Sequence, residues 1–222
     1  MKFSTSVLAI ATALIGSAQA HYRFTSLIAD GTTTTAYQYV RQNTNYNSPV
    51  FTGSTDLRCN TGADSGASTS TYTVAAGSTI GFKMDQPIYH AGPVLVYISK
   101  APSTAAAYDG SGSWAKIYQI APTFSGGNVD WGTVSDTFTF KLPSSLAAGE
   151  YLVRIEQIAL HSMPAQFYIS CAQLKVTGGG SAVPSGISFP SGYSATDPGI
   201  ALNIYYPPMT SYAMPGPAVW SG

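Results

Sequence analysis

Charged side chains are scarce in this chain. Asp, Glu, Lys and Arg make up 9% of its 222 residues, and its formal net charge is zero. A protein that binds nucleic acid or an anionic membrane surface needs a basic patch, and this composition has too few cations to build one. We therefore expect neither kind of partner.

A long hydrophobic run is also absent. The apolar stretch Val7–Ile15 is shorter than the roughly 20 residues that a membrane-spanning helix requires, which argues against a membrane anchor. It follows the basic Lys2 and precedes the small-x-small pattern Ala18-Gln19-Ala20, the arrangement of a secretory signal peptide. We predict that residues 1–20 are a signal peptide cleaved after Ala20, and that residues 21–222 form a secreted monomer.

Cysteine is nearly absent, since the chain contains only Cys59 and Cys171. An isolated pair in an exported protein most often forms a disulfide. The alternative, a thiolate metal site, lacks any Cys-x-x-Cys spacing. We predict a Cys59–Cys171 disulfide.

Helical periodicity is missing as well. Short runs rich in Val, Ile, Tyr, Phe and Thr are separated by Gly, Pro, Ser and Asp, a pattern that predicts antiparallel strands in an all-β sandwich. Segments 31–60 and 101–130 lack such patterning and are expected to be long loops. The predicted strands lie in Ser70–Phe82, Pro93–Ile98, Asp136–Leu142, Tyr151–Ile158 and Gln166–Val176.

From Gly178 onward the chain holds 7 of its 14 prolines. A flexible linker is one interpretation, but apolar residues such as Ile200 and Trp220 make the segment too hydrophobic and too irregular for one. We expect the tail to pack across the protein as extended segments. Residues 21–222 would then be one catalytic domain with no carbohydrate-binding module.

Histidine is the third scarce residue type, with three copies. Cleavage after Ala20 would make His21 the N-terminal residue, so that its α-amine and a ring nitrogen could chelate one metal ion. The α-amine has an ordinary pKa of about 7.7–8.0, so a metal can displace its proton near neutral pH. One further imidazole completes a flat set of three nitrogens that suits Cu(II). A histidine placed there by chance is the alternative.

His90 lies in a turn directly before an apolar strand, where a side chain can project from the end of a sandwich. Taken alone, a structural histidine fits this position better. Along the strand that begins at Gln166, period-two alternation predicts that Gln166 and Tyr168 share one face. The opposite face is predicted to point toward the core, with Phe167, Ile169 and Cys171.

His161 comes just before this strand. A phenol such as Tyr168 can occupy an axial position on a nitrogen-bound copper, and a nearby histidine and glutamine can hydrogen-bond an oxygen species. Without the three histidines, a core tyrosine with a buried hydroxyl would be the better interpretation of Tyr168.

Several motifs occur together along the mature chain: His21-Tyr22-x-Phe24, His90-x-Gly92-Pro93, Tyr151–His161, Ala165–Cys171, Pro198–Ile200, Asn203–Tyr205 and Pro215–Trp220. Jointly they resemble fungal lytic polysaccharide monooxygenases of auxiliary activity family nine, over essentially all of residues 21–222. Many members of that family carry a second disulfide, for which this chain lacks the cysteines.

The resemblance implies an immunoglobulin/fibronectin-like β-sandwich with a flat substrate-binding face. It assigns one copper ion to His21 and His90, with Tyr168 axial and His161 and Gln166 beside the metal as catalytic residues. O2 or H2O2 would be the co-substrate, an external electron donor the reductant, and cellulose or another β-glucan the substrate. Two further tyrosines are expected to bind substrate, Tyr212 in the C-terminal loop and Tyr46, with ordinary loop packing as the alternative for each.

Two other functions compete with this one for a secreted β-sandwich. A hydrolytic glycosidase needs two carboxylates flanking the scissile bond, and the sequence offers no pair that can be placed in one site. A non-catalytic secreted sandwich that binds copper or polysaccharide is the remaining alternative, and Tyr168, His161 and Gln166 argue against pure metal capture. The His21-Tyr22-x-Phe24 start and the short loops favour oxidation at C1 over C4.

Overall fold

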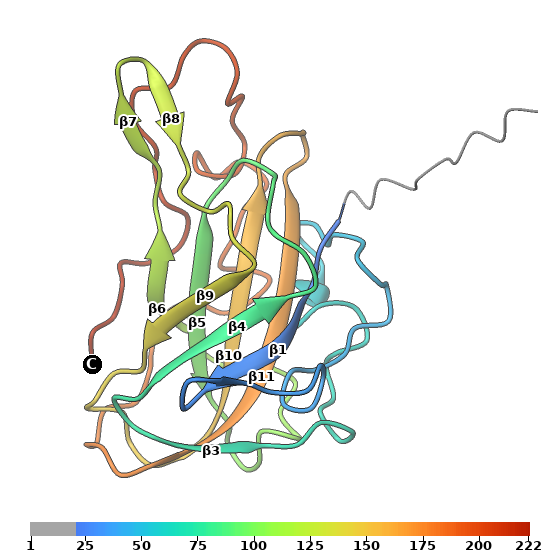
Figure 1. Cartoon of the computed structure of the whole chain (residues 1–222), viewed down its shortest axis with the longest axis vertical. Coiled ribbons are helices and arrows are strands. Elements are labelled where there is room, and N and C mark those ends of the chain that lie inside the picture. The colour runs from blue at the N-terminus through green and yellow to red at the C-terminus, as the bar shows by residue number, and fades with distance from the viewer. Residues whose placement is uncertain (1–20) are drawn as a thin grey trace, which may run out of the picture.

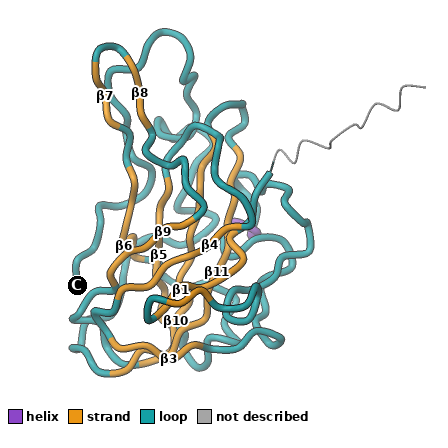
Figure 2. Tube along the Cα trace, in the orientation of Figure 1, coloured by secondary structure: helices purple, strands orange, loops and turns teal. Residues whose placement is uncertain are grey.

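The computed structural model describes residues 21–222, so the predicted signal peptide lies outside the described residues. The chain folds into two facing β-sheets and a small projecting hairpin (Figure 1), and the expected all-β sandwich is confirmed. Loops account for much of the chain, and one 3-10 turn occurs at Thr55–Leu57 (Figure 2). Within residues 21–222, no helix has the length and hydrophobicity needed to cross a membrane.

The first sheet has four strands in the order β2-β1-β4-β9. Their bounds are Thr32–Thr33, Phe24–Ala29, Thr79–Met84 and Thr137–Lys141. The second sheet has five strands in the order β3-β11-β10-β5-β6. Their bounds are Tyr72–Ala75, Gln166–Thr177, Gly149–Ala159, Val94–Lys100 and Ala115–Ile120. The hairpin pairs β7 with β8, at Thr123–Ser125 and Asn128–Asp130.

Strands β10 and β11 form a long antiparallel ladder that carries several of the residues predicted to lie near the metal. Their register runs from Gly149 opposite Val176 to Ala159 opposite Gln166. His161 lies in the connection between the two strands, and Tyr168 lies opposite Gln157. Residues from 157 to 168 therefore gather at one end of the sandwich.

Both faces of β11 are buried, which corrects the expectation that only one face contacts the core. Tyr168 and Ala172 pack between the two sheets, whereas Phe167, Ile169 and Cys171 belong to a second apolar cluster on the outer side of the five-stranded sheet. Loops and the C-terminal tail cover that outer side. Alternation predicts which residues share a face, and burial of the second face depends on distant segments.

The C-terminal tail packs onto the protein, as expected. Phe189, Tyr193 and Ile200 are buried in the outer cluster, and Tyr193 donates a hydrogen bond to the Glu156 carboxylate. That carboxylate forms a fully buried ion pair with Arg154 at 2.7 Å. The tail therefore covers a charged pair that solvent would otherwise reach.

The predicted strands are present, but the segment 101–130 is only partly a loop. It contains β6, the edge strand beside β5, and the β7–β8 hairpin. Lys116 in β6 is buried, and a charged residue at a buried position interrupts the apolar pattern of the strand. The burial is tolerated because the Lys116 ammonium group donates to the distant Pro215 carbonyl at 2.7 Å. A buried lysine of this kind cannot be recognised from local alternation.

The predicted disulfide is confirmed: Cys59 and Cys171 are bonded and are separated by 112 residues in the sequence. It ties the loop after Thr55–Leu57 to the middle of β11.

Replacing both cysteines by serine is expected to lower thermal stability while leaving the Cu(II) resonance spectrum of the loaded protein unchanged. Closing a loop of this length removes unfolded-state entropy worth about 4–5 kcal/mol in the ideal chain model. Thermal unfolding and electron paramagnetic resonance would measure the two effects, with the disulfide-bonded parent as control. A large change in the copper spectrum would mean that the sulfurs contribute to the metal site.

Candidate metal centre

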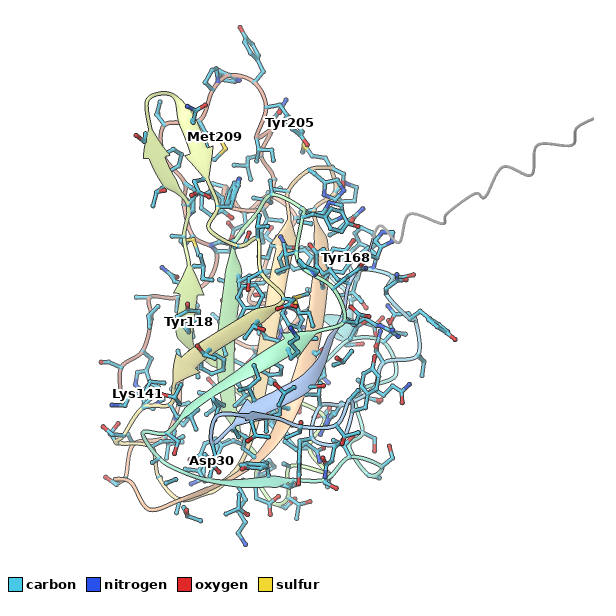
Figure 3. The ribbon with its side chains drawn as sticks, viewed as in Figure 1. Asp30, Tyr118, Lys141, Tyr168, Tyr205 and Met209 are labelled. Carbon is cyan, nitrogen blue, oxygen red and sulfur yellow. A yellow bond between two sulfur atoms is a disulfide. The ribbon has the colours of Figure 1, made fainter. Side chains whose placement is uncertain are left out.

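Three rings from separate segments meet at one end of the sandwich. His21 begins the described chain, His90 lies in the loop between β4 and β5, and Tyr168 lies near the start of β11. The ring centroids are 6.4 Å apart for His21 and His90, 5.8 Å for His21 and Tyr168, and 6.1 Å for His90 and Tyr168. Figure 3 shows Tyr168 close to the point where the described chain begins.

The spacing of the two histidines fits a shared metal ion. Metal–imidazole bonds of about 2.0–2.1 Å place two opposed ring centroids about 6–6.5 Å apart, and the observed separation is 6.4 Å. Among residues 21–222, no group of three His, Cys, Asp or Glu side chains forms a metal site. Cleavage after Ala20, as predicted from the sequence, would make a third nitrogen available from the His21 α-amine.

The backbone of His21 is fixed by two side-chain amides. Its carbonyl accepts hydrogen bonds from Asn47 at 3.2 Å and from Gln86. Arg23 is held by Asp85, which accepts from the Arg23 backbone N–H and from its guanidinium, both at 2.8 Å. The segment that leads into β1 is therefore anchored at His21 and at Arg23.

The loop that carries His90 approaches β10 closely at Gly92. The glycine has φ +144, and a Cβ there would lie 1.8 Å from the Ile158 carbonyl oxygen. Glycine is required because only it combines this conformation with so close an approach. The contact fixes the distance between the His90 loop and the end of the five-stranded sheet.

His161 stacks flat on His90, with ring centroids 3.8 Å apart and an interplanar angle of 6°. Within residues 21–222, its buried Nδ1 has no hydrogen-bond partner. Burial lowers the pKa of His161, and the neighbouring His21 lowers it further. Both effects favour the neutral form of the imidazole, and its orphaned nitrogen leaves one hydrogen-bonding position to be satisfied by another group.

Tyr168 donates a hydrogen bond from its hydroxyl to Gln166 Oε1 at 2.9 Å. Burial raises the pKa of the Tyr168 phenol, and nearby Tyr89 raises it further. The phenol therefore remains protonated, and the amide of Gln166 sets the direction in which its hydroxyl points.

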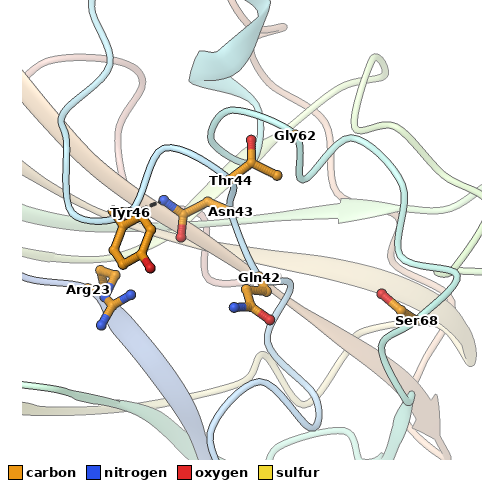
Figure 4. A pocket seen from close by; sticks show the side chains of 7 residues that line it. All are labelled: Arg23, Gln42, Asn43, Thr44, Tyr46, Gly62 and Ser68. Atoms are coloured by element: carbon orange, nitrogen blue, oxygen red, sulfur yellow. Dashed lines mark hydrogen bonds between the residues drawn. The ribbon is translucent and has the colours of Figure 1, made fainter.

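The predicted substrate-binding tyrosines occupy different environments. Tyr46 is 76% exposed, and the Arg23 guanidinium lies 5.8 Å from its ring centroid. The two residues line a polar surface recess with Asn43 and neighbouring side chains (Figure 4). Tyr212 is half-buried, with its hydroxyl donating to the Gly199 carbonyl at 2.6 Å and its ring edge against Trp131.

Sequence reasoning missed the two exposed tyrosines of the C-terminal loop. Tyr205 and Tyr206 are 69% and 77% exposed, and Figure 3 shows Tyr205 on the loop beyond one end of the sandwich. The Tyr205 hydroxyl lies 3.4 Å from the His161 carbonyl, next to a recess of about 200 Å³ that both residues line. The available signal was the Tyr-Tyr-Pro-Pro sequence, since proline lacks a backbone N–H and therefore favours surface turns over strands and helices.

The family model of Auxiliary Activity family 9 (formerly GH61) matches residues 21–212. The chain belongs to this family. The predicted family membership is thereby confirmed, and the matched region begins at His21.

Named relatives agree with this assignment. The chain is 52% identical to AA9 family lytic polysaccharide monooxygenase E of Podospora anserina, over 100% of the chain and 75% of the relative. It is 46% identical to monooxygenase H of Malbranchea cinnamomea, over 95% of the chain and 96% of the relative. The chain is therefore a lytic polysaccharide monooxygenase, an enzyme that cleaves polysaccharides oxidatively, and the hydrolytic and non-catalytic alternatives are not supported.

Solved structures of the family share the fold. The crystal structure of HiLPMO9B matches with a TM-score of 0.80 and 32% identity, over 91% of this chain and 100% of that one. A cellulose-active polysaccharide monooxygenase from M. thermophila matches with a TM-score of 0.78 and 33% identity, over the same shares. The family-nine monooxygenase described here is thus similar to these enzymes along nearly its whole length.

Proposed function

We propose that this family-nine enzyme is secreted, cleaved after Ala20, and binds one copper ion. The His21 α-amine and the rings of His21 and His90 would hold the ion, with the Tyr168 phenol beside it. The single observation that carries the proposal is the 6.4 Å separation of the two histidine rings, with His21 directly behind a cleavage signal. Copper suits this set because Cu(II) leads the divalent affinity series and favours tetragonal nitrogen sites.

When bound, the copper would supply redox chemistry in which O2 or H2O2, with electrons from an external donor, removes hydrogen from C1 or C4 beside a glycosidic bond. Cellulose or a related β-1,4-glucan is the proposed substrate. A solved relative described as cellulose-active supports this choice, as does the low charge of the chain.

The residues around the proposed copper ion have separate roles. His161 presents a neutral imidazole beside His90, and its free nitrogen can hydrogen-bond an oxygen species. Gln166 orients the Tyr168 hydroxyl. The exposed rings of Tyr46, Tyr205 and Tyr206 can stack on sugar rings, and Tyr212 would contribute the accessible part of its ring.

The proposal predicts oxidised oligosaccharides from cellulose. The chain starting at His21, loaded with copper and supplied with ascorbate, is expected to release mainly C1-oxidised products, which mass spectrometry separates from C4-oxidised ones. The same protein treated with a chelator is the control and should release none. Unoxidised oligosaccharides from both samples would contradict the proposal and indicate hydrolysis.

A further inference from the structure

Gln157 occupies a buried position beneath the histidine pair. It lies in β10, is 0% exposed, and stands opposite Tyr168 on β11 and Val94 on β5. Because side chains alternate along a strand, its side chain shares the inner face of β10 with Ile155 and Ala159, both of which belong to the core between the sheets. A fully buried polar amide among these apolar neighbours requires specific partners.

The two partners belong to the two histidine-bearing segments. The Tyr22 hydroxyl donates to Gln157 Oε1 at 2.6 Å, and Gln157 Nε2 donates to the His90 backbone carbonyl at 3.3 Å. Tyr22 follows His21 directly in the chain, and its ring centroid lies 4.5 Å from that of Tyr168. One amide thus connects the start of the mature chain with the His90 loop.

A glutamine amide supplies both the acceptor and the donor that these bonds need. An ionised glutamate accepts from Tyr22 but cannot donate to a carbonyl, and methionine or leucine can do neither. The close approach of Gly92 brings the loop within reach, because a Cβ at Gly92 would lie 3.1 Å from Gln157 Nε2. The close packing at Gly92 and the amide of Gln157 therefore both hold the loop that carries His90.

We propose that Gln157 is a positioning residue that fixes the separation of His21 and His90 by joining Tyr22 to the His90 carbonyl. This inference rests on the proposed copper site, because its main consequence is for metal affinity. The residue acts through its two partners and does not touch the metal or the substrate. Its role is to hold both rings in a metal-binding arrangement before the metal arrives, which lowers the cost of ordering them on binding.

Gln157→Met tests the proposal, because methionine has a similar length and removes both hydrogen bonds. In the chain starting at His21, the Cu(II) dissociation constant measured by calorimetry is expected to rise about tenfold, at the lower end of the range for lost partners of metal ligands. Tyr22→Phe removes only one of the two bonds and should give a smaller rise. It also serves as the test if Gln157→Met fails to fold.

Gln173→Met is the matched control. Gln173 is also 0% exposed, but it lies on the outer side of β11, where its amide bonds Arg41 and the Thr69 carbonyl. This variant is expected to lose stability and to keep the copper affinity of the parent. An equal loss of affinity in Gln173→Met would overturn the proposal, because the effect would then reflect general destabilisation.

A metal-free measurement separates this inference from the copper site itself. Amide hydrogen exchange around His90 is expected to speed up in Gln157→Met and to stay unchanged in Gln173→Met. If the parent binds copper tightly and Gln157→Met binds it equally well, Gln157 has no positioning role. If the parent fails to bind copper, the proposed function is wrong, and unchanged exchange around His90 in Gln157→Met would overturn the present inference separately.

Discussion

A form of the enzyme that retains Ala20 in front of His21 is expected to lose copper binding and oxidative activity together. The nitrogen of His21 is then an amide without a basic lone pair, so the site keeps two imidazole nitrogens and loses the chelating amine. Loss of a mere hydrogen-bond partner of a metal ligand costs about 10- to 100-fold in affinity, so loss of the ligand itself should cost at least about 100-fold.

Calorimetric titration with Cu(II) would compare the extended form with the chain that starts at His21. A form with one alanine added after Gly222 controls for the extra residue and should behave like the parent. The fold of the extended form should be intact, because Asn47 and Gln86 hold His21 through its carbonyl and not through its nitrogen. Normal copper affinity and normal cellulose oxidation by the Ala20 form would show that the α-amine is not a ligand.

His161→Ala is expected to slow oxidation strongly while leaving Cu(II) affinity close to that of the parent. Its ring stacks on His90 and presents an unpaired nitrogen, so it can contact an oxygen species without contacting the metal. One hydrogen bond lost from a transition state is worth roughly 2–4 kcal/mol, or about 30- to 1,000-fold in rate. Gln166→Glu should act in the same direction, because a carboxylate still accepts from the Tyr168 hydroxyl but lacks the amide N–H that could donate to an oxygen species.

His90→Ala is the contrasting variant, and it should lose copper and activity together. Copper titration and oligosaccharide release under ascorbate would be measured on all three variants. Full activity in His161→Ala would remove the oxygen-handling role and favour a site used only for metal capture. Unchanged activity in every variant would place the catalytic centre elsewhere.

Much of the fold could be predicted from local pattern. The strands around Val94, Tyr151 and Gln166 appear where β-branched and aromatic residues alternate between turns, because that alternation is itself the geometry of a strand. The disulfide followed from the number of cysteines and the expected compartment. The strand containing Lys116 was not predicted, because a buried lysine does not fit an apolar strand pattern. The Lys116 ammonium group is paired with a carbonyl of the tail, about 100 residues later in the chain.

The sequence alone determined which residues are available for chemistry. Three histidines, one of them directly after a predicted cleavage signal, and a glutamine and tyrosine sharing one strand face are properties of order and spacing. These properties can be read from the sequence because the order of residues and the two-residue alternation of a strand are both local.

Only the tertiary structure decided how these residues meet. The 6.4 Å between the His21 and His90 rings depends on how β1 and the His90 loop pack, and on the amide of Gln157 between them. Exposure was decided in the same way, because Tyr212 folds inward against Trp131 while Tyr205 remains on the surface. A local pattern predicts which face of a strand a side chain lies on. The residues it contacts come from segments far away in sequence, and a local pattern does not predict how those segments pack.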